Sequence, residues 1–247
     1  MLRKTVLGVL VLFVVFTAPV AVHGLHRGVP EGHWSSASRV SAGLAPDPTA
    51  ERRAVIQVYA APTVRWRGIF AVHSWVVVKR AGAVAYDRYD LVGWYGGEIR
   101  HNHMAPDSRW YGAEPQILLD IRGGPEVEVL IDKVEQAIET YPYEGRYRSF
   151  PGPNSNTFVA HVGRSVPELG LDLPANAIGK NWLPWHAPFD TAPSGSGGML
   201  SFEGLAGILI APEEGVEFTF LGLSLGIDFN PMDIRLPGFG SVAPPPS

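Results

Sequence analysis

Residues 69–92 read IFAVHSWVVVK, RAGA and VAYDRYDLV, two apolar alternating segments joined by a short connection. Alternation of this kind is typical of half-buried strands, and Ala81-Gly82 suits a two-residue turn. The stretch therefore predicts a β-hairpin with strands over 69–79 and 84–92. A two-residue turn sets His73 directly opposite Asp90, so that both side chains share one face.

Further elements are expected on both sides of this hairpin. One strand is predicted over 55–60, and another over 117–121 after a mixed polar and aromatic loop. Apolar residues recur at steps of three and four between Pro125 and Pro142, which predicts a helix there. Asn154 is a suitable N-cap for a second helix that begins at Ser155. Glycine-rich alternating segments after residue 192 predict more strands. The expected fold class is α+β, with a central, mainly antiparallel sheet and packed helices.

The N-terminal segment has the composition of an export signal. Arg3 and Lys4 precede an uncharged apolar run from Thr5 to Val22 that is long enough to cross most of a bilayer. We expect a signal sequence or membrane anchor over 1–24, with the following chain on the outer side. Because residues 18–23 form a poor cleavage site, an anchor is favoured. The expected location is the cell envelope, on the periplasmic side of the inner membrane.

The rest of the chain is expected to form one globular domain over 53–240. A flexible linker, rich in Gly, Ser, Pro and Ala, is predicted over 25–52, and a disordered tail over 241–247. Removing Arg3 and Lys4 from the 20 basic residues leaves 18 against 24 acidic ones, a formal charge of −6. This charge makes nucleic acid an unexpected partner. The expected partners are the membrane, through the N-terminal segment, and a cell-envelope substrate or protein.

The chain contains no cysteine, which excludes disulfides, thiolate metal sites and a thiol nucleophile. His101 and His103 lie in a polar loop, but two alternate histidines are a loose metal signal. Neither a metal site nor a cofactor is expected.

An acyl-transfer site needs a nucleophile, a base, a group that orients the base and donors for the oxyanion. Ser155 at a helix start, His73 on a strand and Asp90 on the neighbouring strand supply these parts, and they are the candidate catalytic residues. Asn154, Asn156 and Trp75 are the candidate substrate-binding residues. Each residue also has a structural interpretation: His73 as a core histidine, Asp90 as a partner of Arg88, and Ser155 as a second capping residue.

Several sequence blocks resemble a known family. They are WRGIFAVHSW (66–75), YDLVGW (89–94), YPY (141–143), PGPNSNTF (151–158), LPANAIGK (173–180), PSG (193–195), EGVE (214–217) and LGL (221–223). Together these blocks are similar to the bacterial domain-of-unknown-function 3750 family over roughly residues 55–240. The family has no established activity, so the resemblance implies none.

A more remote resemblance carries a mechanism. NSNTF (154–158) is similar to the helix-opening motif of circularly permuted relatives of papain-like cell-wall peptidases and acyltransferases, with Ser155 in the cysteine position. His73 corresponds to the strand histidine of that group. The resemblance implies a papain-like permuted fold and acyl chemistry on amide or ester bonds. Because serine replaces cysteine, two functions stay open: a serine-type hydrolase or acyltransferase, and a catalytically inactive binding or structural module of the envelope.

Overall fold

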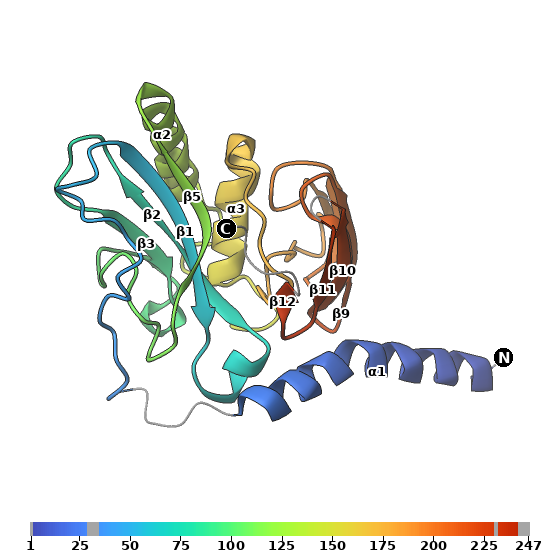
Figure 1. The fold of residues 1–247 in the computed structure, drawn as a ribbon. Coiled ribbons are helices and arrows are strands. Elements are labelled where there is room, and N and C mark those ends of the chain that lie inside the picture. Colours follow the sequence, from blue (N-terminus) through green and yellow to red (C-terminus); the bar gives the residue numbers. More distant parts are fainter. Residues whose placement is uncertain (1, 29–34, 230–231, 242–247) are drawn as a thin grey trace.

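The computed structural model describes residues 2–28, 35–229 and 232–241. Within these ranges it contains three α-helices and two antiparallel β-sheets, which lie on either side of helix α3 (Ser155–Ser165) (Figure 1). The α+β class is confirmed, but two sheets take the place of the one central sheet that was expected. Apart from Ser241, which ends the last strand, the predicted tail lies outside the described residues.

The first sheet has five strands in the order β4-β3-β2-β1-β5. Their bounds are β1 Ala54–Pro62, β2 Val72–Lys79, β3 Asp87–Leu91, β4 Ile99–His101 and β5 Gln116–Gly123. Two short 3-10 helices, η1 (Arg65–Ile69) and η2 (Gly93–Tyr95), lie at the end of this sheet where the candidate site forms. The strand predicted to begin at residue 69 therefore begins three residues later, after η1.

The register of the central hairpin differs from the prediction by two residues. Val78, rather than Val76, lies opposite Asp87, because the connection runs from Arg80 to Tyr86 instead of through a two-residue turn. A shift of two residues keeps side chains on the same face. His73 and Asp90 thus share a face as predicted, but they are diagonal neighbours and not a directly opposed pair.

Two helices cover one face of the first sheet. Helix α2 (Pro125–Glu139) begins after Gly123-Gly124 as predicted, and helix α3 begins at Ser155 with Asn154 as its N-cap. Ile131 and Phe158 from these helices are fully buried in one apolar cluster with Ile56 of the sheet. This apolar layer holds the start of α3 beside the start of β2.

The second sheet has seven strands in the order β12-β11-β10-β9-β8-β7-β6, so each strand pairs with its sequence neighbour. The bounds are β6 Phe189–Asp190, β7 Gly198–Phe202, β8 Ala206–Ala211, β9 Gly215–Phe220, β10 Leu223–Phe229, β11 Met232–Leu236 and β12 Gly240–Ser241. The strands expected after residue 192 are therefore present, in a sheet of their own.

The N-terminal region forms helix α1 (Leu2–Arg27), whose segment Arg3–His26 contains an 18-residue stretch with a mean hydropathy of 2.6 and is long enough to cross a membrane. The linker predicted over 25–52 lies partly outside the described residues. Its residues 38–46 are not a loose tether, because they bond to the loop over 105–112: Asp107 accepts from the amides of Leu44 and Ala45, and the amide of Gly112 donates to Ser38.

Candidate active site

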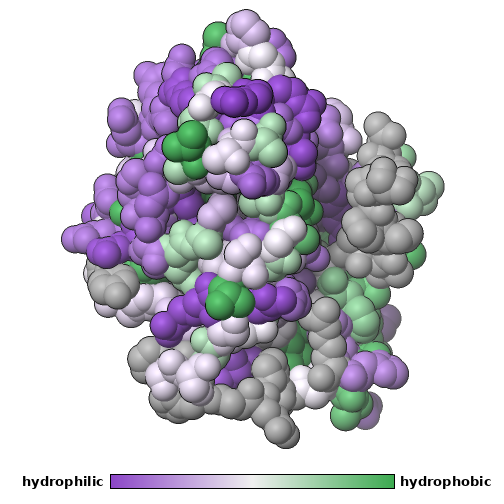
Figure 2. Space-filling model, turned by 60° about the vertical axis from the view of Figure 1, so that its left-hand side comes forward, coloured by the Kyte–Doolittle hydropathy of each residue, from purple (hydrophilic) through white to green (hydrophobic). Residues whose placement is uncertain are grey.

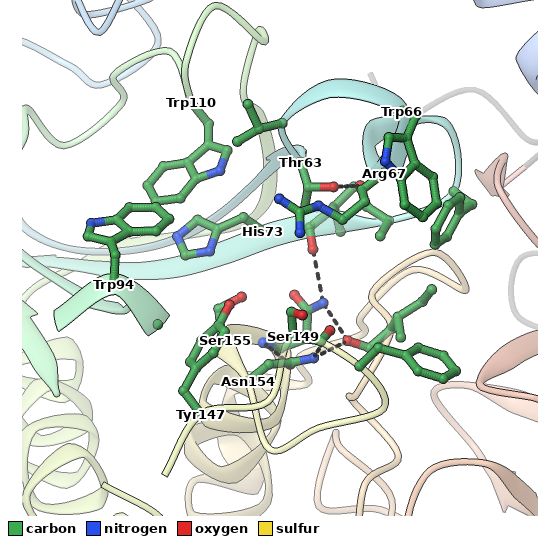
Figure 3. A pocket seen from close by; sticks show the side chains of 18 residues that line it. Thr63, Trp66, Arg67, His73, Trp94, Trp110, Tyr147, Ser149, Asn154 and Ser155 are labelled. Carbon is green, nitrogen blue, oxygen red and sulfur yellow. Dashed lines mark hydrogen bonds between the residues drawn. The ribbon is translucent and has the colours of Figure 1, made fainter. Parts of the chain in front are cut away.

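A cavity of about 740 Å³ opens at the end of the first sheet, between η1, η2 and the start of α3 (Figure 3). All of its lining residues come from the segment 63–178. They are Thr63, Val64, Trp66, Arg67, Phe70, Ala71, Val72, His73, Gly93, Trp94, Trp110, Tyr147, Ser149, Phe150, Asn154, Ser155, Asn156 and Ile178.

His73 and Asp90 form a buried pair on the first sheet. His73 is the second residue of β2, and its Nε2 lies 2.9 Å from Oδ1 of Asp90 on β3. The His73 side chain is 4% exposed and that of Asp90 is fully buried. Because Nε2 is committed to Asp90, Nδ1 is the ring nitrogen that remains for the cavity.

Arg88 holds the same carboxylate from the other side. Its Nε lies 2.6 Å from Oδ2 of Asp90, its Nη2 lies 2.9 Å from Oδ1, and its Nη1 donates to Ala105 O and Ser108 Oγ. Burial alone would raise the pKa of Asp90, but the charge and hydrogen bonds of Arg88 outweigh it and hold that pKa well below its ordinary value. Asp90 is therefore a permanent carboxylate.

Burial also controls the protonation of His73. It lowers the pKa of the imidazole by more than the hydrogen bond and charge of Asp90 raise it, and the positive charge of Arg88 lowers it further. His73 is consequently neutral at neutral pH, with a proton on Nε2 for Asp90 and a lone pair on Nδ1. This is the protonation state of a general base.

Aromatic rings fix the plane of the imidazole. Trp110 stacks on His73 with ring centroids 3.6 Å apart, and Trp94 stacks on Trp110 at 5.6 Å (Figure 3). Trp75 does not belong to this wall. It is fully buried, donates from Nε1 to Pro106 O and is not among the cavity residues. An inward position on β2 buries the Trp75 ring under the 104–113 loop, and a role of Trp75 in binding substrate stays a prediction.

Ser155 is the first residue of α3, and the hydrogen bonds that cap this helix do not include its backbone N–H group. Oδ1 of Asn154 accepts from the amides of Asn156 and Thr157, while Oγ1 of Thr157 accepts from the amide of Asn154. These bonds satisfy three of the four N–H groups that a helix start leaves open. Among the described residues, no acceptor is assigned to the fourth amide, that of Ser155, whose side chain lines the cavity.

The Ser155 hydroxyl faces Tyr147 in this structure. Burial raises the pKa of Tyr147, and the nearby Ser155 hydroxyl partly offsets that rise. No hydrogen bond joins Ser155 to His73 in the part of the chain that the structure describes. The two residues nevertheless line the same cavity, on facing walls (Figure 3).

Asn154 and Asn156 both line the cavity, and both have structural bonds. The Asn156 amide nitrogen donates to Val72 O at 3.0 Å and Ile178 O at 2.8 Å, and its Oδ1 accepts from Ser74 Oγ at 2.8 Å. Asn156 therefore ties the start of α3 to β2, and so sets the position of Ser155 relative to His73. A role of either asparagine in binding substrate stays a prediction.

Of the two loop histidines, His101 has a hydrogen-bond partner and His103 has none within the described residues. His101 Nε2 lies 2.8 Å from Oδ1 of Asp87, and His103 Nδ1 lies 3.6 Å from Oδ2 of Asp90, beyond hydrogen-bond distance. Within the described ranges, no group of three or more His, Cys, Asp or Glu side chains is arranged to hold a metal ion.

Trp110, Tyr147 and Arg67 are among the cavity residues that the sequence did not predict to be functional. Trp110 lies in the aromatic loop after β4, and a tryptophan in a polar loop was its one local signal. Tyr147 and Arg67 carry no local motif, because only the folded chain brings their segments beside Ser155.

Comparison with known proteins gives one match. A family model described as "Protein of unknown function (DUF3750)" matches residues 53–182. The chain belongs to this family. The DUF3750 match is narrower than the span of roughly 55–240 inferred from the sequence blocks, but it includes every residue that lines the cavity. It ends before β6, so the second sheet lies outside it. No curated protein and no solved structure matches the chain.

Proposed function

We propose that the cavity is a serine-type acyl site, which hydrolyses or transfers acyl groups at amide or ester bonds. The observation that carries the proposal is the buried Asp90–His73 pair, whose free ring nitrogen and Ser155 border the same cavity. The order of the parts, with a strand histidine before a helix-opening nucleophile, agrees with the papain-like permuted arrangement. The proposed setting is the cell envelope, where candidate substrates are peptidoglycan peptides, lipids and exported proteins.

The proposed reaction proceeds through the side chains of Ser155 and His73. The Ser155 hydroxyl turns from Tyr147 toward His73, and its oxygen attacks the carbonyl carbon while Nδ1 of His73 accepts its proton. The amide N–H of Ser155, at the positive end of α3, stabilises the oxyanion. His73 then returns the proton to the departing amine or alcohol. Water or an acceptor hydroxyl or amine next attacks the acyl-enzyme while His73 takes its proton, and His73 returns that proton to the Ser155 oxygen as the bond to the acyl group breaks.

One feature favours a second function, a non-catalytic binding module. The Ser155 residue is 3% exposed and makes no hydrogen bond to His73 within the described residues, while Trp66, Trp94 and Phe150 offer exposed aromatic surface around the cavity. A module of this kind would bind an envelope component by stacking, without turnover.

A single substitution distinguishes the two functions without knowledge of the substrate. Because the chain has no cysteine, Ser155→Cys introduces its only thiol. A thiol within reach of His73 ionises well below the ordinary pKa of about 8.5. We expect the pH profile of iodoacetamide alkylation to show this lowered pKa, and adding His73→Ala to move it upward by about one unit or more.

Ser149→Cys is the matched control, because Ser149 lines the same cavity but is exposed and lies outside α3. Its thiol is expected to ionise near 8.5 with or without His73. In the unsubstituted protein, a fluorophosphonate probe should label Ser155 and should fail to label Ser155→Ala or His73→Ala. An unperturbed thiol at position 155 together with absent labelling would reject the acyl site and leave the binding module.

A further inference from the structure

Strands β9–β11 of the second sheet bury polar side chains and expose apolar ones, whereas β7 and β8 bury an apolar cluster that includes Met199 and Leu209. On β9, Glu217 and Thr219 are buried, whereas Phe218 between them is 51% exposed. The inward face carries Glu217, Asp228 and Arg235 in a buried ionic cluster with Lys180. A sheet that packs on a protein core through one face normally turns its apolar side inward.

The outward face is apolar without interruption. The outward positions of β7–β11 are every second residue over 198–202, 206–210, 216–220, 223–229 and 232–236, and none of them is charged. One row of directly paired residues crosses five strands: Phe189, Leu200, Ile208, Phe218 and Leu225. A contiguous apolar surface of this extent marks a protein or membrane interaction site. The side of the molecule that carries the first sheet is different, since Figure 2 shows it mostly hydrophilic with scattered apolar residues.

Helix α1 connects this face to the membrane-crossing segment. Phe16 of α1 packs against Phe220, an outward residue of β9, with ring centroids 5.6 Å apart. Toward its N-terminus, α1 extends past the second sheet on the outward side (Figure 1). The residues that extend, such as Leu7, Leu10 and Val14, are about half-exposed and apolar.

We propose that the outward face of the second sheet docks on the lipid bilayer that α1 enters. The proposal concerns the second sheet and does not depend on chemistry at Ser155. The apolar helix α1 and the uncharged sheet face both lie on this one side of the molecule. A single lipid surface therefore covers both.

The length of α1 supports this geometry. The 13 residues from Arg3 to Val15, which precede the contact at Phe16, span about 20 Å at 1.5 Å per residue. A hydrocarbon core is about 30 Å thick. Arg3 and Lys4 therefore reach the far headgroups only if the sheet face sinks into the near leaflet by about 10 Å, a depth usual for interfacial apolar faces.

The absence of charge on the outward positions of β7–β11 also defines the type of lipid contact. A surface that recognises anionic headgroups carries Lys or Arg, and these positions carry neither. The contact is therefore apolar, and we expect it in zwitterionic phosphatidylcholine vesicles as well as in anionic ones, with little change on adding salt.

The test places a fluorophore on single cysteines in the full chain, reconstituted in phosphatidylcholine vesicles. Ile227→Cys and Phe229→Cys report the outward face, and Val129→Cys is the matched control, an exposed apolar residue on α2. We expect quenchers attached to lipid acyl chains to quench the labels at 227 and 229 several-fold more than the label at 129. A water-soluble quencher should show the reverse order.

Two results would overturn the proposal. Equal aqueous quenching at positions 227 and 129 would show that the face is in water. Shielding of 227 and 229 from both quenchers, with crosslinking between copies through the same cysteines, would show that a second copy covers the face. Both experiments leave Ser155 and His73 unchanged, so their outcome does not bear on the proposed acyl site.

Discussion

The two sheets of this chain bury opposite kinds of side chain. The first sheet encloses Ile56, Val58 and Val78 under α2 and α3, and its other face carries the His73–Asp90 pair beneath an aromatic loop. The second sheet buries charged side chains under β9–β11, where Arg235 binds Asp172 and Asp228. The outward residues of this sheet are apolar. Which side chains are buried in this protein therefore depends on what covers each sheet face, and not on the hydropathy of the residues alone.

The largest expected effect is in the ionic interior of the second sheet. Arg235→Ala removes the cation shared by Asp172, Glu217 and Asp228 and leaves Lys180, which pairs with Glu217, to compensate these carboxylates. Losing one partner of a buried charge cluster typically costs about 3–5 kcal/mol. Urea unfolding of the variant measures this loss.

The control for that variant is Arg109→Ala, which removes a surface pair with Glu114 and should cost below about 1 kcal/mol. If Arg235→Ala were as mild as this control, the cluster would not stabilise the second sheet.

A smaller effect is expected at the junction of α3 with the first sheet. Asn156→Ala leaves Ser74 Oγ and Val72 O without this partner and leaves Ile178 O with only the bond from Asn154 Nδ2, which costs about 2–3 kcal/mol at the usual penalty for buried polar groups. Ser74→Ala removes only one of these bonds and should cost about 1 kcal/mol. Denaturant unfolding of both variants measures the ratio, and equal losses would contradict the bridging role of Asn156.

The two regions should also respond to pH with opposite sign. Burial lowers the pKa of His73, His103 and His161 from an ordinary 6.5, so the unfolded chain binds more protons below that pH and stability falls as the pH drops through 6.5. Burial instead raises the pKa of Glu214 beside the second sheet, so the native state holds its proton longer. Stability from this carboxyl is complete below about pH 4 and is lost as the pH rises above it.

The pH comparison is measured by unfolding free energies between pH 4 and 8. His161→Gln should flatten the slope below pH 6.5, while Glu214→Gln should flatten the opposing slope at higher pH. A His161→Gln profile identical to that of the unsubstituted protein would mean that its imidazole titrates alike in both states.

The smallest effect is expected on the outward face of the second sheet. Phe218→Ser changes a half-exposed side chain and should alter the unfolding free energy in detergent solution by at most about 0.5 kcal/mol. Phe158→Ala, in the core under the first sheet, should cost about 3–5 kcal/mol. Similar costs for the two variants would show that protein and not lipid covers Phe218.

Local sequence signals predicted the first sheet and its helices well. The cap at Asn154, the helix after Gly123-Gly124 and the shared face of His73 and Asp90 each depend on residues close in sequence or on a strand period of two. The hairpin register failed because it depends on the length of a connection, and Ala81-Gly82 resembled a two-residue turn inside a longer one.

The second sheet shows a deeper limit. The alternation at residues 216–220 predicts a strand, but a period of two is the same whichever face is buried. Nothing in that segment tells that Glu217 points inward, since its partners Lys180 and Arg235 lie far away in the sequence. The burial of Trp75 could not be predicted for a related reason, because its loop cover comes from residues more than thirty positions later.

The contact between α1 and η1 joins anchoring to the site. Gly24 of α1 lies directly against the Ile69 side chain, and η1 supplies Trp66 and Arg67 to the cavity wall. The helix thus supports the mouth of the cavity. A protease that cut the chain after α1 would remove this support and so change the shape of the cavity entrance.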